Sequence, residues 1–289
     1  MLAETGDLLD LRRHGYAAEL KLDGTRALVI KENGKVRVQN REGIDYTRRL
    51  QEVVVSASKI SGDFIIDGEV ICLDQQGRND FVACQRRCST QDLAGIYFLM
   101  HQHPAYFYAF DILSLNGEDL TDLQYIERKQ VLKGLLSQPT ESIRYLPHRF
   151  DLEEFFEEIR QQEGEGVMLK DIQSIYEPGR SSSWLKVKNW RTMEACVMGY
   201  TAGKNARSRY FGSLVLARDG RFCGRVGSGF TEVQLRSYTN LMKNSPQVPR
   251  PFEIRDPYVA VKTDLKVEVK FYQLTKDRVM RFPVFLRSL

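Results

Sequence analysis

One stretch decides how this chain folds: Glu19-Leu20-Lys21-Leu22-Asp23-Gly24-Thr25-Arg26. Residues 16–22 have the pattern of a half-buried strand, the Asp-Gly pair forms a turn, and residues 27–30 belong to a second apolar strand. A lysine at the end of a strand, beside a tight turn, is held at the edge of a pocket. It can act as a nucleophile only when unprotonated, and since its ordinary pKa is about 10.4, it needs burial or cationic neighbours. A surface lysine before a turn would have the same local sequence, so the rest of the chain must decide.

Five further motifs follow in order, most of them beside predicted strands. They are Asn40-Arg41-Glu42-Gly43, Asp67-Gly68-Glu69, Phe110-Asp111, the run Glu165 to Lys170 and the run Trp184 to Lys188. The D-G-E motif is predicted to end an apolar strand over residues 64–66, and Phe110-Asp111 to close an aromatic strand. Together with the first stretch, and spaced over about 170 residues, they resemble motifs I, Ia, III, IIIa, IV and V of the ATP-dependent DNA ligases.

The chain changes in texture near residue 189, which predicts two domains. Residues 1–188 alternate short strands with turn signals and a few helices, as is typical of an α+β domain built on antiparallel sheets. Residues 189–289 predict five short strands and one helix over 231–242, the content of a small OB-type β-barrel. The resemblance implies an adenylation (nucleotidyltransferase) domain over 1–188 and an OB-fold domain over 189–289. It lies nearest to the ligase modules of prokaryotic non-homologous end-joining systems.

The resemblance implies a reaction in three steps. ATP adenylates a lysine, AMP moves to the 5′-phosphate of nicked DNA, and the 3′-hydroxyl then expels AMP. Lys21 would be the nucleophile. Glu19 would contact the adenine as a specificity residue, Phe110 would stack on the base, and Glu69 would lie near the ribose or a metal. Cationic side chains would hold the phosphates, namely Arg26, Arg41, Lys186 and Lys188. Lys170 is a further possible site residue, although a solvated strand end would have the same sequence.

Each of these steps needs in-line positioning and neutralisation of the phosphoryl oxygens. The two lysines of the last motif are two residues apart on a predicted strand, so both can point at one phosphate. Arg26 and Arg41 would hold the AMP or the phosphate at the nick through bidentate contacts. Glu165, with Asp23 nearby, would supply hard oxygen ligands that favour Mg²⁺ or Mn²⁺. ATP and one of these ions are therefore the expected cofactors.

Charge is distributed unevenly, although the net charge of the chain is only +4. Residues 178–226 hold ten basic residues against two acidic ones, a net charge of +8. A basic segment of this size is expected of a protein that binds the phosphate backbone, although a solvated face would have the same composition. The acidic residues 151–165 are more simply a solvated helix face. We expect nicked or broken duplex DNA to be the partner.

The composition is ordinary for a globular protein, with 42% hydrophobic and 28% charged residues in 289. No apolar run approaches the ~20 residues of a membrane span, and the N-terminal residues lack the pattern of a signal peptide. Five scattered cysteines indicate reduced thiols rather than disulfides or a zinc site. We therefore predict a monomer in the cytoplasm, associated with the nucleoid and not with a membrane.

The sequence leaves two other functions open. An RNA ligase or an mRNA-capping-type nucleotidyltransferase would share the lysine chemistry, and covalent adducts formed with labelled ATP or GTP would separate ATP use from GTP use. A non-catalytic DNA-binding OB module would have kept the basic barrel and lost the chemistry, which the intact motif residues argue against. Use of NAD⁺ is not expected, because no extra domain precedes Lys21 and no four-cysteine cluster follows the barrel. The resemblance implies an end-binding ring protein and a repair polymerase as partners.

The last residues raise one more expectation. The stretch Met280 to Arg287 resembles the end of ligase OB domains, where relatives continue into an R-x-D-K element, motif VI, thought to orient the leaving pyrophosphate. The sequence stops about where that element would begin. Without its cations we expect slow self-adenylation but near-normal sealing of a pre-adenylated nick, because the later steps release no pyrophosphate. Arg281 or Arg287 would be a partial substitute.

Overall fold

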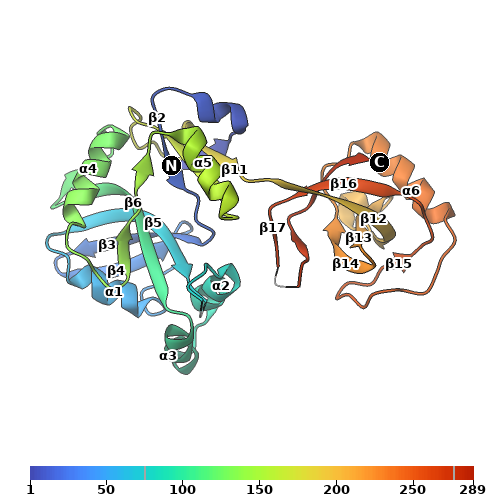
Figure 1. Cartoon of the computed structure of the whole chain (residues 1–289). Coiled ribbons are helices and arrows are strands. Elements are labelled where there is room, and N and C mark those ends of the chain that lie inside the picture. Colours follow the sequence, from blue (N-terminus) through green and yellow to red (C-terminus); the bar gives the residue numbers. More distant parts are fainter. Residues whose placement is uncertain (75, 276) are drawn as a thin grey trace. The chain divides into compact units, whose positions relative to one another are not determined.

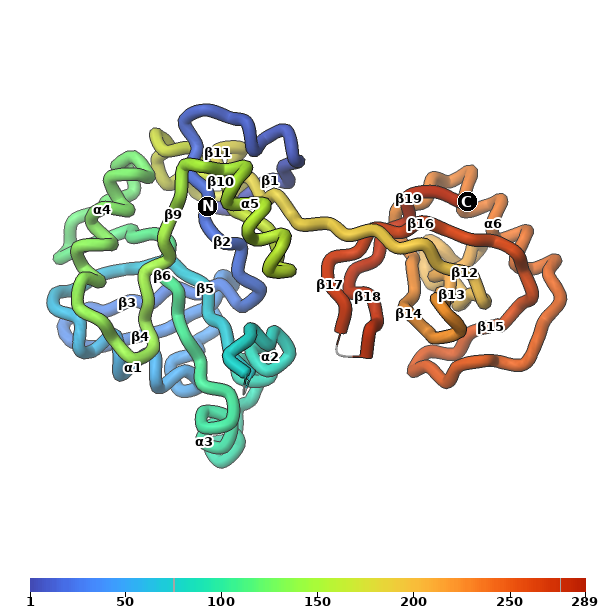
Figure 2. The backbone as a smooth tube through the Cα atoms, viewed as in Figure 1, coloured from blue at the N-terminus to red at the C-terminus, as the bar shows by residue number. Residues whose placement is uncertain are grey.

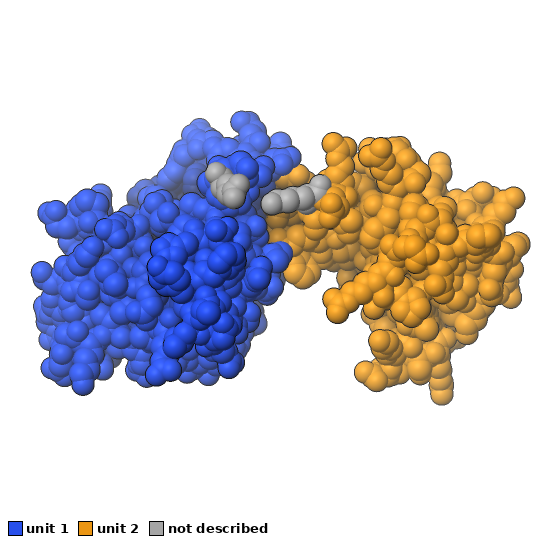
Figure 3. Space-filling model, turned by 90° about the horizontal axis from the view of Figure 1, so that it is seen from below, with its two compact units in different colours: residues 1–188 blue, residues 189–289 orange. Residues whose placement is uncertain are grey.

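The structure is a computed structural model that describes residues 1–74, 76–275 and 277–289. The chain divides into two compact units, Met1–Lys188 and Asn189–Leu289, which are coloured separately in Figure 3. The first unit is built on two mainly antiparallel sheets with helices packed around them. The second is built on one larger sheet, a short two-stranded ladder and the helix α6 (Glu232–Asn244). These mixed elements confirm the predicted α+β class.

The larger sheet of the first unit carries the middle motifs of the sequence (Figure 1). Its strand order is β4-β3-β5-β6-β7, with β8 added parallel to β6. The bounds are Thr25–Glu32 for β3, Lys35–Asn40 for β4, Phe64–Cys72 for β5, Ala105–Leu115 for β6, Glu118–Asp119 for β7 and Ile143–Tyr145 for β8. The helices are α1 (Gln51–Ser58), α2 (Phe81–Ser89), α3 (Leu93–Gln102) and α4 (Tyr125–Leu135). Of these, α1, α2 and α4 pack on the sheet, and α3 packs on α2.

The smaller sheet carries the first and last motifs. Its strand order is β1-β11-β10-β2-β9, so segments far apart in the sequence lie side by side (Figure 2). The bounds are Leu2–Thr5 for β1, Tyr16–Leu20 for β2, His148–Arg149 for β9, Gly166–Asp171 for β10 and Arg180–Lys188 for β11. Helix α5 (Leu152–Gln161) covers one face, where Phe156 and Ile159 pack on Val167 and Val187. Because side chains alternate along a strand, the residues between these project from the opposite face.

Two motifs lie inside strands and not at strand ends, contrary to the sequence prediction. Asp67-Gly68-Glu69 is in the middle of β5, and Phe110-Asp111 is inside β6. The strands continue because the two aspartates are buried and each is paired with an arginine from another segment. Glycine is required between Asp67 and Glu69, since a Cβ at Gly68 would collide with the ring of Phe107 on β6. Charged residues therefore mimic a strand end when their partners are distant in sequence.

The second unit is a small barrel. Its strand order is β14-β13-β12-β16-β19, with β15 paired to β12 and with β17 and β18 in a separate ladder. The bounds are Arg191–Ala202 for β12, Phe211–Arg218 for β13, Arg221–Val226 for β14, Val259–Ala260 for β15, Lys266–Phe271 for β16, Gln273–Leu274 for β17, Met280–Arg281 for β18 and Val284–Ser288 for β19. A bridge between Ser228 and Val284 joins the two edges of the sheet. The predicted OB-type fold is confirmed.

Helix α6 begins where the sequence places it. Thr231 accepts a hydrogen bond from the N–H of Gln234, and the Gln234 side chain accepts one from the N–H of Thr231. Leu235 and Met242 of this helix pack into the core of the barrel. Across the described part of both units, none of the helices has the length and hydropathy needed to cross a membrane.

Candidate active site

Both sheets of the first unit line one pocket. The smaller sheet and its extension contribute Glu19, Lys21, Met168, Lys170 and Trp184, and the larger sheet contributes Arg26, Glu69 and Phe110. Strand register explains the first group: Glu19 pairs with Met168, and Met168 pairs with Lys186, so these side chains share a face. Lys21 stays on that face because it lies two residues beyond Glu19 and its N–H donates to the Gly166 carbonyl at 3.0 Å.

At the inner end of the pocket, the lining residues Glu19 and Lys170 belong to a buried polar cluster. Tyr125 and Lys129 complete the cluster from behind the pocket wall. Glu19 Oε1 accepts hydrogen bonds from the Tyr125 hydroxyl at 2.8 Å and from Lys129 Nζ at 2.7 Å. Glu19 Oε2 is ion-paired with Lys170 Nζ at 2.7 Å. Burial acts to raise the pKa of Glu19, but the two ammonium groups outweigh it and hold that pKa below its usual value. The carboxylate is therefore charged in the folded protein at neutral pH.

Aromatic rings surround Lys170. Its Nζ lies 3.9 Å from the ring centroid of Trp184, 4.3 Å from that of Phe110 and 5.1 Å from that of Tyr125. Burial lowers the pKa of Lys170, although Glu19 opposes the shift. Within the described residues, Trp184 Nε1 is buried without a hydrogen-bond partner. Lys170 Nζ is paired with Glu19 Oε2, which can engage only some of its three N–H donors. Buried donors thus remain available at the pocket.

Lys21 and Glu69 line the outer end of the pocket, and Glu165, Lys186 and Lys188 lie close to Lys21. Lys21 Nζ forms a close ion pair with Glu165 Oε1. Burial raises the pKa of Glu165 to about 7 and that of Glu69 to about 8, although Lys21 lowers both. Burial also lowers the pKa of Lys186 and Lys188, and repulsion from Lys21 adds to both shifts. Burial therefore disfavours both kinds of charge here, whereas at the inner end Glu19 keeps a lowered pKa.

The turn that follows Lys21 is fixed to the larger sheet. A Cβ at Gly24 would collide with the backbone carbonyl of Val70 on β5, so only glycine fits. Asn79 Nδ2 donates to the Asp23 carbonyl at 2.7 Å. The carboxylate of Asp23 lies near enough to contribute to the raised pKa of Glu165. These contacts place the turn beside β5, the strand that carries Glu69.

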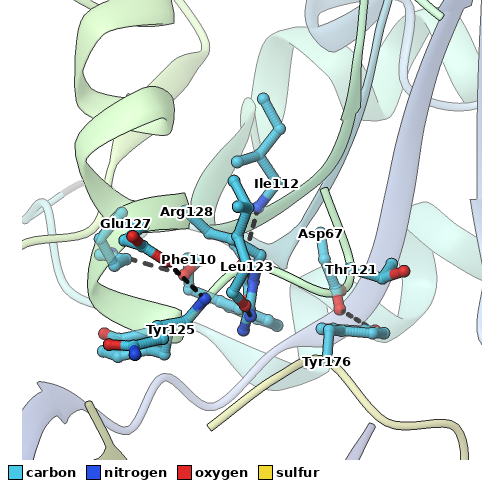
Figure 4. A network of polar contacts seen from close by, with 12 residues as sticks. Asp67, Phe110, Ile112, Thr121, Leu123, Tyr125, Glu127, Arg128 and Tyr176 are labelled. Carbon is cyan, nitrogen blue, oxygen red and sulfur yellow. Dashed lines mark hydrogen bonds and ion pairs between the residues drawn. The ribbon is translucent and has the colours of Figure 1, made fainter. Parts of the chain in front are cut away.

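Arg26 is engaged within the protein. Its Nε and Nη2 make a bidentate pair with Asp67 at 3.0 and 2.6 Å, and Nη2 also contacts the Tyr176 hydroxyl at 3.1 Å. Tyr176 in turn donates to Asp67 Oδ2 at 2.8 Å (Figure 4). Asp67 and the Tyr176 hydroxyl raise the pKa of Arg26 against the effect of burial. The expected bidentate grip of Arg26 on a phosphate would require this pair to open.

Three other candidates lie away from the pocket lining or in the second unit. Arg41 is exposed and contacts Glu42 at 3.3 Å. In the barrel, Arg281 Nη1 donates to the Gln273 side chain at 3.1 Å, and Arg287 Nε pairs with Glu268 at 2.7 Å. None of these three arginines is among the described residues that line the pocket.

Helix α4 contributes polar residues that the motifs do not indicate. Tyr125, Arg128 and Lys129 are all fully buried. Arg128 makes a bidentate pair with Asp111 at 2.7 and 3.0 Å. It also donates to the Leu123 carbonyl at 2.5 Å (Figure 4). A signal exists in the sequence: two cations occupy positions of α4 that share its buried face with Leu132. Arginine and lysine side chains are fully buried almost only when they are paired with a charged or polar group.

The acids of the outer end bear on metal binding. Among the described residues, no three His, Cys, Asp or Glu side chains cluster closely enough to hold a metal by themselves. Glu165 Oε2 is nevertheless buried with no hydrogen-bond partner in the described part of the chain. Mg²⁺ commonly takes one or two carboxylates together with substrate phosphates and water. The donor set here fits an ion of that kind.

Comparison with known proteins identifies the family. The model of the ATP-dependent DNA ligase domain matches residues 1–188, and that of the ATP-dependent DNA ligase C-terminal region matches residues 207–288. These matches agree with a lysine-bearing pocket in one unit followed by an OB-type barrel. The chain belongs to the ATP-dependent DNA ligase family.

Individual relatives place it more closely. It is 32% identical over 300 residues to the multifunctional non-homologous end joining protein LigD of Mycolicibacterium smegmatis, covering 98% of this chain and 37% of that protein. It is 33% identical to a probable DNA ligase of Streptomyces coelicolor, covering 92% of this chain and 53% of that protein. A structure of mycobacterial DNA ligase D complexed with ATP and MES is 28% identical, with a TM-score of 0.58 over 99% of this chain and 92% of that one. The chain thus spans about a third to a half of these curated relatives.

Proposed function

We propose that this chain is an ATP-dependent DNA ligase that seals nicks between a 5′-phosphate and a 3′-hydroxyl through a lysyl-AMP intermediate. The observation that carries the proposal is the position of Lys21, which lines a pocket with Glu19 and Lys170 of the buried polar cluster and lies close to Lys186 and Lys188. Family membership supports the same chemistry. A lysine at this junction can reach a phosphorus while the rest of the nucleotide is held behind it.

The first step uses Lys21 as the nucleophile. Its Nζ, after losing a proton, attacks the α-phosphorus of ATP; the N–P bond forms while the P–O bond to pyrophosphate breaks. Glu165 is ion-paired with this nitrogen, so the pair must separate or exchange a proton before attack. Lys186 and Lys188 would neutralise phosphoryl oxygens, because they project from the same face of β11. AMP then passes to the 5′-phosphate, and the 3′-hydroxyl displaces it.

The inner end suits adenine better than guanine. Adenine carries an amino donor at the ring position where guanine carries a carbonyl acceptor. Glu19 Oε2 faces the pocket as a charged acceptor, and Lys170 Nζ beside it has donors to spare for an unprotonated ring nitrogen. Guanine would bring its acceptor against the carboxylate. We therefore propose ATP as the nucleotide, with Phe110 beside the base.

We further propose that Glu165, with Asp23 nearby, helps to hold Mg²⁺ or Mn²⁺ against the phosphates, while Glu69 lies near the ribose or the metal. The unpartnered oxygen of Glu165 supports this assignment. The ion would add positive charge where the triphosphate carries negative charge.

For partners, we propose nicked or broken duplex DNA, gripped in part by the basic segment 178–226. The relatives named for non-homologous end joining support a role in double-strand-break repair. An end-binding ring protein and a repair polymerase are the partners that this role would require. We propose a monomer that acts in the cytoplasm at the nucleoid.

Two assays test the proposed function. The protein is incubated with labelled ATP or GTP and examined for a covalent adduct, and it is then given nicked DNA, nicked DNA with a 3′-ribonucleotide, and nicked RNA. We expect an adduct with ATP and joining of nicked DNA. Joining of nicked RNA alone would make the chain an RNA ligase, and DNA binding without any adduct would make it a non-catalytic module.

A further inference from the structure

A fully buried lysine stands behind the pocket. Lys129, on α4, points its Nζ at three acceptors: Glu19 Oε1 at 2.7 Å, the Leu146 carbonyl at 2.6 Å and the Phe110 carbonyl at 3.4 Å. An ammonium group has three N–H donors, so all of them are engaged. The three acceptors belong to residues that line the pocket, whereas Lys129 itself does not. One side chain thus ties together three separate parts of the pocket wall.

Tyr125 completes the hold on Glu19. Its hydroxyl donates to the same oxygen, Oε1, at 2.8 Å, and the residue is fully buried like Lys129. Oε1 therefore has two donors, while Oε2 faces Lys170 and the pocket. Rotation of the carboxylate would break both of these hydrogen bonds to a charged oxygen. The orientation of Glu19 is set from α4.

We propose that Lys129 and Tyr125 are positioning residues that determine which nucleotide the pocket accepts, by holding Glu19 with one oxygen toward the base. This inference rests on the proposed function. Without Lys129, Glu19 keeps only Lys170 as a cationic partner and can turn toward it. The carbonyl of Phe110 also loses its donor, so the wall beside the base loosens. Lys21 makes no contact with either residue, so the chemical step should be affected little.

The alternative is that α4 merely stabilises the fold, and three variants distinguish the two roles. Lys129→Met keeps an unbranched side chain of similar length and removes the ammonium group, while Tyr125→Phe removes only the hydroxyl. Arg87→Met is the matched control, because Arg87 is a fully buried cation of the same unit that pairs with Glu52 at 2.5 Å, and neither residue lines the pocket. Each variant is compared with the unaltered chain.

The rate of self-adenylation is measured in single-turnover reactions against the concentration of ATP and of GTP, with a thermal melt of each protein. For Lys129→Met we expect about a 10-fold rise in the half-saturating ATP concentration, a limiting rate within about 3-fold, and about a 10-fold loss in preference for ATP over GTP. Tyr125→Phe should shift the same quantities by about 3-fold. Arg87→Met should lower the melting temperature and leave the nucleotide preference unchanged.

Failure of this inference is distinct from failure of the proposed function. If the unaltered chain forms no adduct with any nucleotide, the proposed function falls, and this inference with it. If the unaltered chain is adenylated but Lys129→Met and Tyr125→Phe keep its half-saturating concentration and its preference, only the inference is overturned. If Lys129→Met does not fold, Tyr125→Phe decides by the same readout.

Discussion

The two ends of the pocket shift the pKa of their carboxylates in opposite directions. At the inner end, Glu19 has a lowered pKa and lies among two ammonium groups and a phenol, so its charge is matched before any ligand arrives. At the outer end, burial raises the pKa of Glu69 and Glu165 and lowers that of the two lysines of β11. At the inner end, the charge of the carboxylate is therefore stabilised by the protein itself. At the outer end, a triphosphate and a cation would add counter-charges to groups whose charge burial disfavours.

The largest effect should come from the outer end. Lys21→Ala should reduce formation of the covalent AMP adduct by more than about 10³-fold, because the nucleophile is lost. Lys21→Arg should fail equally, since a guanidinium stays protonated. Adducts are read from denaturing gels, and circular dichroism serves as the folding control. A lysyl-AMP adduct in either variant would show that another lysine carries the chemistry.

The next largest difference between the two ends should be in how much a substitution lowers the free energy of unfolding. Glu19→Ala leaves two buried ammonium groups without their carboxylate and should destabilise the first unit by about 3–5 kcal/mol. Glu165→Ala removes a carboxylate whose charge burial already disfavours and leaves one partly exposed ammonium group, that of Lys21, so it should cost less, about 1–3 kcal/mol. Urea unfolding in a Trp190→Phe background, followed through Trp184, measures both. Equal losses would mean that the ends do not differ in this way.

Ionic strength should act on DNA more than on the base. If the basic segment makes about four phosphate contacts, affinity for nicked duplex should fall about 10²-fold between about 50 and 200 mM salt. The preference for ATP over GTP depends on buried groups and should stay constant over the same range. Titrations of labelled DNA and competition between the two nucleotides give the two curves. A DNA affinity that does not change with salt concentration would show that the basic segment does not bind the DNA.

The effect of pH is the most gradual, because it is spread over several pH units. Glu69 has a pKa of about 8 when folded, against 4.5 for an ordinary glutamate, so the folded chain keeps a proton that the unfolded chain releases. Its contribution to the free energy of unfolding therefore falls as pH rises from about 4.5 to about 8, by at most about 1.4 kcal/mol per pH unit. Glu69→Gln should flatten that part of the profile and become relatively more stable as pH rises. An unchanged slope would show that Glu69 is ionised in the fold.

Local sequence goes far toward explaining the outer end. Lys21 is placed by a strand, a turn and a second strand, and Lys186 and Lys188 by the alternation of one strand, all of which are short-range patterns. The inner end depends on contacts that such patterns do not contain. Lys129 lies 110 residues from Glu19 along the chain, so only the packing of α4 on β6 brings them together. The positions of the polar residues inside β5 and β6 could not be predicted from the neighbouring sequence either, because the arginines that pair with them come from other segments.

The glycine that follows Lys21 has a consequence for how such a pocket can change. Gly24 lies against the carbonyl of Val70 with no room for a side chain, so a library randomised at this position should return glycine alone among active clones. The position of the turn, and with it that of Lys21, is then fixed, so new substrates cannot be accommodated by changing the shape of this turn. Changes on α4 remain open, because Lys129 and Tyr125 contact Glu19 and not the turn that holds Lys21.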